Sequence, residues 1–198
     1  MIRIEKTFIT GTEPAIRGMR NPLDSHEKSD DFGPADTELA MKLSALGGPH
    51  AKYRRMIVVY ADITAPLYWW KEFDTYKVST VANSNSTMHT IHKKKFTLFD
   101  FSFEHLTAEN INLLHMVIDN LNWDREEFLR SNNKDNWWQL IQLLPSSYNQ
   151  LRTVMMNYEV LANIYQYRKN HKLDEWREFC KWIETLPHYK LITGTDTE

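Results

Sequence analysis

Cysteine is nearly absent from this sequence of 198 residues, and its scarcity excludes a disulfide within the chain. The single Cys180 lies between Phe179 and Trp182, an apolar context that favours a buried thiol over a nucleophile. No apolar run approaches the roughly 18 residues that a membrane-spanning helix needs, and the first residues lack the apolar stretch of a signal peptide. We therefore expect a cytoplasmic protein that does not enter a membrane.

An excess of basic charge is also missing. The sequence has 24 Lys and Arg against 26 Asp and Glu, a formal net charge of -2, so no global positive field exists to hold nucleic acid. One basic run at 93–95 follows His92. Such a run indicates either a solvated strand end or loop, or a position beside a nucleotide phosphate.

Several familiar catalytic motifs do not occur. The sequence has no glycine-rich phosphate-binding loop, and Gly47-Gly48 is typical of a helix stop. No Gly-x-Ser-x-Gly elbow supports a hydrolase triad. His89 and His92 lack a third ligand at metal spacing, so a metal site is not expected. The chain therefore offers no obvious nucleophile and no metal centre.

What is present predicts one helix-rich domain over residues 1–198. Hydrophobic residues make up 42% of the sequence and aromatics 13%, enough for a single core. Alternation over 2–9 and the apolar run at 56–60 predict strands. Glycine and proline in 10–34 predict an irregular and mobile loop, with a turn of helix around Ile16. The fold class is α+β, a helix-rich domain packed on a small sheet.

Helical periodicity dominates the rest of the chain. We expect helices over 35–46, from about 65 toward 76, from 107 onward, from about 146 through 168, and from 174. The fourth of these would place Arg152 and Arg168 on one face, with Asn157 and Asn163 between them. Asparagine is unfavourable inside a helix unless it has a partner, so one of the two either serves a ligand or is an exposed polar position.

Paired tryptophans suggest contacts beyond the core. Neighbours in a helix point roughly 100° apart, so only one of Trp69-Trp70 and one of Trp137-Trp138 need face the core. The other side chain of each pair would contact a partner subunit or a ligand, and tryptophan is favoured at interfaces.

Small polar side chains cluster after the predicted helix that ends near Tyr76. Asp74 to Lys77 is followed by a Ser-, Thr- and Asn-rich loop at 79–87 and then by His89. Hydroxyls, backbone N–H groups and a lysine suit phosphate or ribose. The alternative is a polar turn that satisfies its own backbone.

The order of these pieces resembles the flavin-dependent (alternative) thymidylate synthases over roughly residues 38–185. That family carries a Gly-His…Glu-His segment, a strand, and a helix ending in Arg-His-Arg. Here Gly48-Pro49-His50 through Arg55 is similar to the first segment, and Met56 to Ala61 to the strand. Thr75-Tyr76-Lys77 falls where Arg-His-Arg belongs.

The second half of the resemblance begins with the family's Ser/Asn/Glu/Ser/Arg/Tyr loop. Its acid corresponds to Ser84 and its Arg to Met88, so two charges are lost there. Leu144-Pro145 resembles the family's pre-helix Leu-Pro, Asn163 to Arg168 its Asn…Arg stretch, and Asp174-Glu175-Trp176 its final Gln-Trp-Glu segment.

The resemblance implies reductive methylation of dUMP to dTMP, with FAD as cofactor and methylenetetrahydrofolate and NADPH as co-substrates. It also implies a homotetramer. The residues that it assigns to the cofactor are Tyr76, Lys77 and Asn163. Those that it assigns to the pyrimidine nucleotide are Lys77, Asn83, Ser84, Ser86, His89 and Arg168.

Two other functions fit the altered motif. Lysine in place of arginine loses the bidentate fork, and methionine supplies no charge. The chain could therefore be a related enzyme that modifies another pyrimidine nucleotide, or a homo-oligomeric relative that has lost catalysis. Nucleotide and flavin binding separate these three hypotheses.

Overall fold

The computed structural model describes residues 1–194. They form two compact units. The first unit contains Met1–Arg3, Thr64–Thr75 and Asn83–Arg152. The second unit contains Ile4–Ile63, Tyr76–Ala82 and the chain from Thr153 on.

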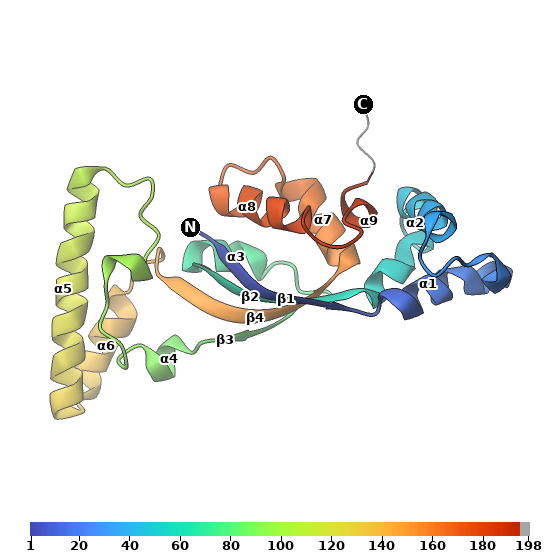
Figure 1. The fold of residues 1–198 in the computed structure, drawn as a ribbon. Helices are drawn as coiled ribbons and strands as arrows, with labels where there is room; N and C mark the ends of the chain where they lie inside the picture. The colour runs from blue at the N-terminus through green and yellow to red at the C-terminus, as the bar shows by residue number, and fades with distance from the viewer. Residues whose placement is uncertain (195–198) are drawn as a thin grey trace. The chain divides into compact units, whose positions relative to one another are not determined.

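A four-stranded sheet runs through the described chain (Figure 1). Its strand order is β1 (Arg3–Thr10), β2 (Val58–Pro66), β4 (Asn149–Asn157) and β3 (Val81–Ser84). The Tyr158 N–H donates to the Ile57 carbonyl at 3.0 Å, whereas Thr153, earlier in the chain, contacts Asp62, later in β2, so β2 and β4 are antiparallel. This register sets Thr153 opposite Asp62, and the Thr153 hydroxyl donates to the Asp62 carboxylate at 2.6 Å.

Strict alternation explains how β2 buries one face. Val59, Ala61, Ile63 and Ala65 are fully buried, whereas the residues between them are exposed or half-buried. The predicted strand at 2–9 is confirmed as β1. The strand predicted at 56–60 begins later and extends further, because His50–Met56 forms the 3-10 helix η3. The α+β class is confirmed.

The helix predicted from about 146 through 168 is wrong. The chain forms β4 and then α7 (Tyr158–Arg168). Apolar residues at 151, 154 and 155 fit helical spacing by chance, and the Asn157 side chain accepts from the Val160 N–H at 2.9 Å to begin the helix there. Arg152 and Arg168 therefore share no helix face, and Asn157 is a helix cap.

The loop predicted at 10–34 is mostly ordered helix. It contains α1 (Thr12–Arg20) and two 3-10 turns, η1 (Asn21–Leu23) and η2 (His26–Lys28), before α2 (Pro34–Leu46). Buried Arg20 donates through Nε to the buried Asp36 carboxylate at 2.5 Å. Asp36 also accepts from the Ser29 hydroxyl at 2.8 Å and the Phe32 N–H at 3.0 Å. The buried Asp36 carboxylate therefore holds in place the connection between α1 and α2, which was predicted to be an irregular loop.

These contacts fix the protonation state of Asp36. Burial on its own disfavours the charged carboxylate, but the hydrogen bonds from Ser29, Phe32, Arg20 and Asp30 outweigh it and lower the pKa of Asp36 to about 2. The carboxylate is therefore charged at any pH near neutrality.

The first unit is built around a helical hairpin. α5 (Ala108–Ser131) and α6 (Lys134–Leu143) pack together, and the Thr107 side chain caps α5 by accepting from the Asn110 N–H. The hydrophobic core of the first unit contains Ile91, Phe96, Phe101, Leu114, Ile118, Leu121 and Leu140. The polar loop predicted at 79–87 is instead β3 followed by the single-turn helix α4 (Thr87–Thr90).

Both tryptophans of the first pair are buried, which corrects the prediction that only one faces the core. On α3 (Leu67–Phe73), Trp69 and Trp70 have no exposed surface and Phe73 is buried, whereas Lys71 is exposed. The Trp70 Nε1 donates to the Gln150 carbonyl at 3.0 Å. Of the second pair, Trp138 is 40% exposed.

The second unit ends in two further helices, α8 (Asp174–Ile183) and α9 (Lys190–Thr193). Cys180 on α8 is buried, as predicted, and burial raises the pKa of its thiol to about 12. No helix in residues 1–194 has the length and apolar character that crossing a bilayer requires.

Candidate functional site

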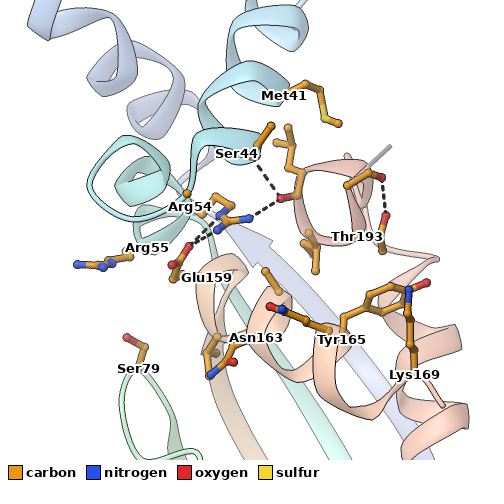
Figure 2. Close-up of a pocket in the computed structure, with 18 of the residues that line it drawn as sticks. Met41, Ser44, Arg54, Arg55, Ser79, Glu159, Asn163, Tyr165, Lys169 and Thr193 are labelled. Carbon is orange, nitrogen blue, oxygen red and sulfur yellow. Dashed lines mark hydrogen bonds and ion pairs between the residues drawn. The ribbon is translucent and has the colours of Figure 1, made fainter. Parts of the chain in front are cut away.

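A pocket of about 1030 Å³ lies within the second unit, and we call it the α7 pocket (Figure 2). Its walls come from α2, η3, the segment 78–79, α7 and α9, which are far apart in sequence. Its volume is at the upper end of the range for pockets that hold cofactor-sized ligands.

Helix α7 supplies one wall of the pocket, and four of its polar and charged side chains form a row. Glu159, Asn163, Gln166 and Lys169 recur at intervals of three or four residues, so they share a face, and all four line the pocket. The Asn157 cap fixes where this helix begins, and its Nδ2 also donates to the Arg55 carbonyl at 3.3 Å.

Arg54 holds three elements of the pocket together. Its guanidinium contacts the Glu159 carboxylate on α7 at 2.7 and 2.8 Å, and its NH1 donates to the Leu191 carbonyl on α9 at 3.1 Å. Figure 2 shows these contacts as dashed lines. The Arg54 side chain is only 11% exposed, so η3, α7 and α9 are joined by a largely buried cation.

A second network supports the wall formed by α2. The Tyr53 hydroxyl donates to the Ala40 carbonyl at 2.8 Å and lies 2.7 Å from the Ser44 hydroxyl. Ser44 in turn donates to the Leu191 carbonyl at 3.4 Å. Burial raises the pKa of Tyr53, which keeps the phenol protonated and able to donate.

The charges that face the pocket are mostly positive. Lys42, Arg55 and Lys169 line it, are exposed, and form no ion pair in the described chain. Among the described lining residues Glu159 is the one carboxylate, and Arg54 neutralises it. The Lys169 ammonium lies 5.6 Å from the centre of the Tyr165 ring. The α7 pocket therefore favours an anionic ligand.

The predicted site residues fall in three places. Asn163 lines the α7 pocket. Tyr76 and Arg168 contact each other: Arg168 Nε donates to the Tyr76 hydroxyl at 2.9 Å, and its guanidinium carbon lies 4.7 Å from the Trp176 ring centre. Lys77 is exposed and directly precedes Val78 and Ser79, which line the pocket.

The remaining predicted residues belong to the first unit. Asn83 and Ser84 are exposed on β3. The Ser86 side chain caps α4 by accepting from the His89 N–H at 3.3 Å. The neighbouring Asn85 N–H donates to the Leu151 carbonyl at 2.9 Å, so the strand pairs with β4 while its side chains stay exposed.

Sequence reasoning missed the basic and acidic residues of the α7 pocket. Lys42, Arg54, Arg55, Glu159 and Lys169 have no mutual spacing that would reveal them, because they come from α2, η3 and α7. Of these residues, only the adjacent Arg54 and Arg55 before β2 form a pattern that is visible in the sequence. No cluster of three or more potential metal ligands occurs in residues 1–194.

Comparison with known proteins identifies the fold. No family model and no curated protein matches the sequence. Among solved structures, flavin-dependent thymidylate synthase ThyX from Helicobacter pylori, complexed with FAD and dUMP, has a TM-score of 0.75 at 20% identity. That match covers 96% of this chain and 98% of the other. A second structure of the same enzyme with FAD and dUMP has a TM-score of 0.75 at 19% identity, with 98% of both chains covered.

The fold is that of a flavin-dependent thymidylate synthase. The UMP/dUMP methylase PolB from Streptomyces cacaoi, bound with 5-Br UMP, shares it with a TM-score of 0.66 at 11% identity, over 98% of this chain and 94% of that chain. The fold expected from the resemblance is therefore confirmed along nearly the whole sequence.

Proposed function

We propose that this protein methylates a pyrimidine nucleotide with the help of a bound flavin, converting dUMP to dTMP. FAD would be the cofactor, methylenetetrahydrofolate the carbon donor and NADPH the reductant. The observation that supports this proposal is a basic pocket of about 1030 Å³ on a fold shared with structures solved with FAD and dUMP.

The residues of the α7 pocket fit a flavin dinucleotide. Its cationic side chains suit a diphosphate, the Asn163 amide can both donate and accept, and Tyr165 offers an aromatic ring at the wall. Bound there, the flavin would supply hydride transfer, chemistry that protein side chains lack. The residues of this chain would bind it, orient it and limit its contact with water.

We assign the nucleotide to the residues that the family resemblance indicates. Arg168 would be one of its donors, and the hydrogen bond from Nε to Tyr76 together with the Trp176 ring sets the orientation of that guanidinium. In the first unit, Asn83, Ser84, Ser86 and His89 are the residues that we propose to bind a nucleotide. Substitution of these residues tests this part of the proposal, and Arg168→Ala should lower nucleotide affinity most.

The second candidate is a related enzyme with a different pyrimidine substrate. It is favoured by Thr75 and Met88, which stand where the resembled family has arginine, and by the similarity to a methylase that acts on UMP as well as dUMP. A thermal-shift panel of dUMP, UMP, dCMP and dTMP separates the two candidates, since the true substrate should stabilise the folded state most.

We also propose that the protein is a homotetramer. Large apolar side chains remain exposed in both units, among them Phe8 (62%) in the second unit and Trp123 (62%) in the first. Light scattering coupled to gel filtration measures the mass in solution. A mass of four chains supports the assembly, and a monomer at micromolar concentration contradicts it.

The function is tested by the flavin and then by turnover. Purified protein should carry a flavin absorbance band after reconstitution with FAD and gel filtration. With dUMP, methylenetetrahydrofolate and NADPH it should form dTMP. Flavin retention without dTMP formation would favour the second candidate, and a protein that retains neither flavin nor nucleotide would favour an inactive relative.

A further inference from the structure

We propose that His171 is a positioning residue, which holds the Arg168 guanidinium in the orientation that receives the nucleotide. The inference rests on the proposed role of Arg168 in nucleotide binding. It adds a residue that neither the family motif nor the lining of the α7 pocket contains, because His171 lies in the turn between α7 and α8.

Contacts at two different nitrogens fix the Arg168 guanidinium within the second unit. Its Nε donates to the Tyr76 hydroxyl at 2.9 Å, and its NH1 lies 2.9 Å from His171 Nε2. The guanidinium carbon also lies 4.7 Å from the centre of the Trp176 ring. The group is planar and rigid, so contacts at two of its nitrogens determine the orientation of its plane. The Tyr76 contact alone would hold only one of its nitrogens.

His171 is itself held in place by its backbone. Its N–H donates to the Arg168 carbonyl at 3.0 Å, and its carbonyl accepts from Arg177 NH1 at 2.6 Å. Arg177 also pairs with Asp174 in the first turn of α8. The imidazole ring lies 6.4 Å from the Trp176 ring. The imidazole is therefore placed beside Arg168 before a ligand binds, which lowers the cost of ordering the guanidinium on binding.

The two ring nitrogens of His171 face two different donors. Nε2 faces Arg168 NH1, and Nδ1 accepts from the Leu173 N–H at 3.2 Å. A guanidinium can only donate, and a neutral imidazole has one nitrogen that accepts. His171 can therefore satisfy one of these donors at a time, and the charge-assisted contact with Arg168 is the stronger. The alternative is that His171 only supports the start of α8, since Leu173 is the N-cap residue of that helix.

The test compares His171→Gln with His171→Asn, because the two amides place an acceptor at different positions. The longer Gln side chain can bring its oxygen to the position of Nε2 and retains an acceptor for Arg168. The Asn oxygen reaches the position of Nδ1 and retains an acceptor for the Leu173 N–H alone. Both side chains are polar and uncharged, so each variant is the control for the other.

Two measurements are made on each purified full-length protein at about pH 8, where histidine is neutral. The first is the affinity for dUMP by titration calorimetry. The second needs no nucleotide: it is the rate at which phenylglyoxal, a reagent for arginine, modifies Arg168, followed by peptide mass spectrometry. A guanidinium that His171 holds should react slowly, and a released one should react faster.

His171→Gln should match the wild type within about twofold in both measurements. His171→Asn should bind dUMP about tenfold more weakly and should be modified at Arg168 about tenfold faster, as expected for the loss of one hydrogen bond to a charged group. In an Arg168→Ala background, His171→Asn should no longer change the dUMP affinity, because the group that it positions is gone.

Other outcomes separate the inference from the proposed function. If His171→Gln loses as much dUMP affinity as His171→Asn, or if neither variant differs from the wild type, the inference is overturned. Wild-type protein that does not bind dUMP contradicts the proposed function, and the modification rates then decide the inference: protection of Arg168 that only His171→Asn loses supports it, and equal rates overturn it. If His171→Asn does not fold, His171→Gln must still match the wild type, and a loss there overturns the inference.

Discussion

Replacing Arg54 with methionine should destabilise the second unit and release α9. The substitution keeps most of the apolar stem and removes the guanidinium, so it deletes the ion pair with Glu159 at 2.7 Å and the hydrogen bond to the Leu191 carbonyl at 3.1 Å. The protein then retains a carboxylate without its partner.

The magnitude follows from burial. The Arg54 side chain is 11% exposed and that of Glu159 29%. Breaking a fully buried pair costs about 3–5 kcal/mol, and an exposed pair contributes about 0–1 kcal/mol. Since water reaches Glu159 in part, we expect the free energy of unfolding to fall by about 2–3 kcal/mol.

A double-mutant cycle in urea measures this coupling. Glu159→Gln alone should cost less than Arg54→Met, because Gln can still accept from the guanidinium. The double variant should recover about 1 kcal/mol or more relative to the sum of the two single changes. Hydrogen exchange at the α9 amides should quicken in Arg54→Met. Additive effects below about 0.5 kcal/mol, with unchanged exchange, would refute the role assigned to Arg54.

Three further predictions follow from other contacts. The lowered pKa of Asp36, from 3.8 to about 2, contributes stability above pH 4 that is lost as the pH falls through 2, about 2.5 kcal/mol in all. Urea unfolding across that range should show this loss in the wild type, and an equally steep loss in Asp36→Asn would contradict it. Asn157→Ala should cost about 1 kcal/mol by removing the α7 cap, whereas Asn157→Asp should cost little; equal losses in chemical denaturation would argue against capping. Tyr76→Phe removes the acceptor for Arg168 Nε and should cost about 1 kcal/mol, and a thermal melt identical to the wild type would show that the hydrogen bond contributes nothing.

Parts of the fold that depend on local signals could be predicted from the sequence. Gly47 ends α2 with a φ of 64°, and Thr107 caps α5, both at the expected positions. Cys180 is buried as its apolar neighbours indicated. Alternation identified β1 because one face of that strand is polar.

Long-range packing determines the elements that were predicted wrongly from the sequence. The stretch 149–157 has apolar residues at both periods, and pairing with β2 selects the strand. Trp69 and Trp70 are both buried because the fold covers two adjacent positions of α3, which spacing within one helix cannot reveal. In 10–34 the buried Arg20–Asp36 pair orders a segment whose composition is typical of a loop.

The candidate site was predictable only where motif order could locate it. Asn163 was assigned from its place before Arg168, and it lines the α7 pocket. The Arg54–Glu159 pair joins residues 105 positions apart, and Lys42 reaches the same pocket from a third element. No pattern in a single sequence indicates that such distant residues line one pocket, so the charges of the pocket could be identified only in the structure.

Flavin retention separates a flavin-dependent enzyme from an inactive relative. The protein should be reconstituted with FAD and passed through gel filtration, and the visible absorbance of the protein peak should be recorded. The proposed function predicts a flavin band that elutes with the protein. A folded wild-type protein that elutes without the band would contradict the proposed flavin-dependent function.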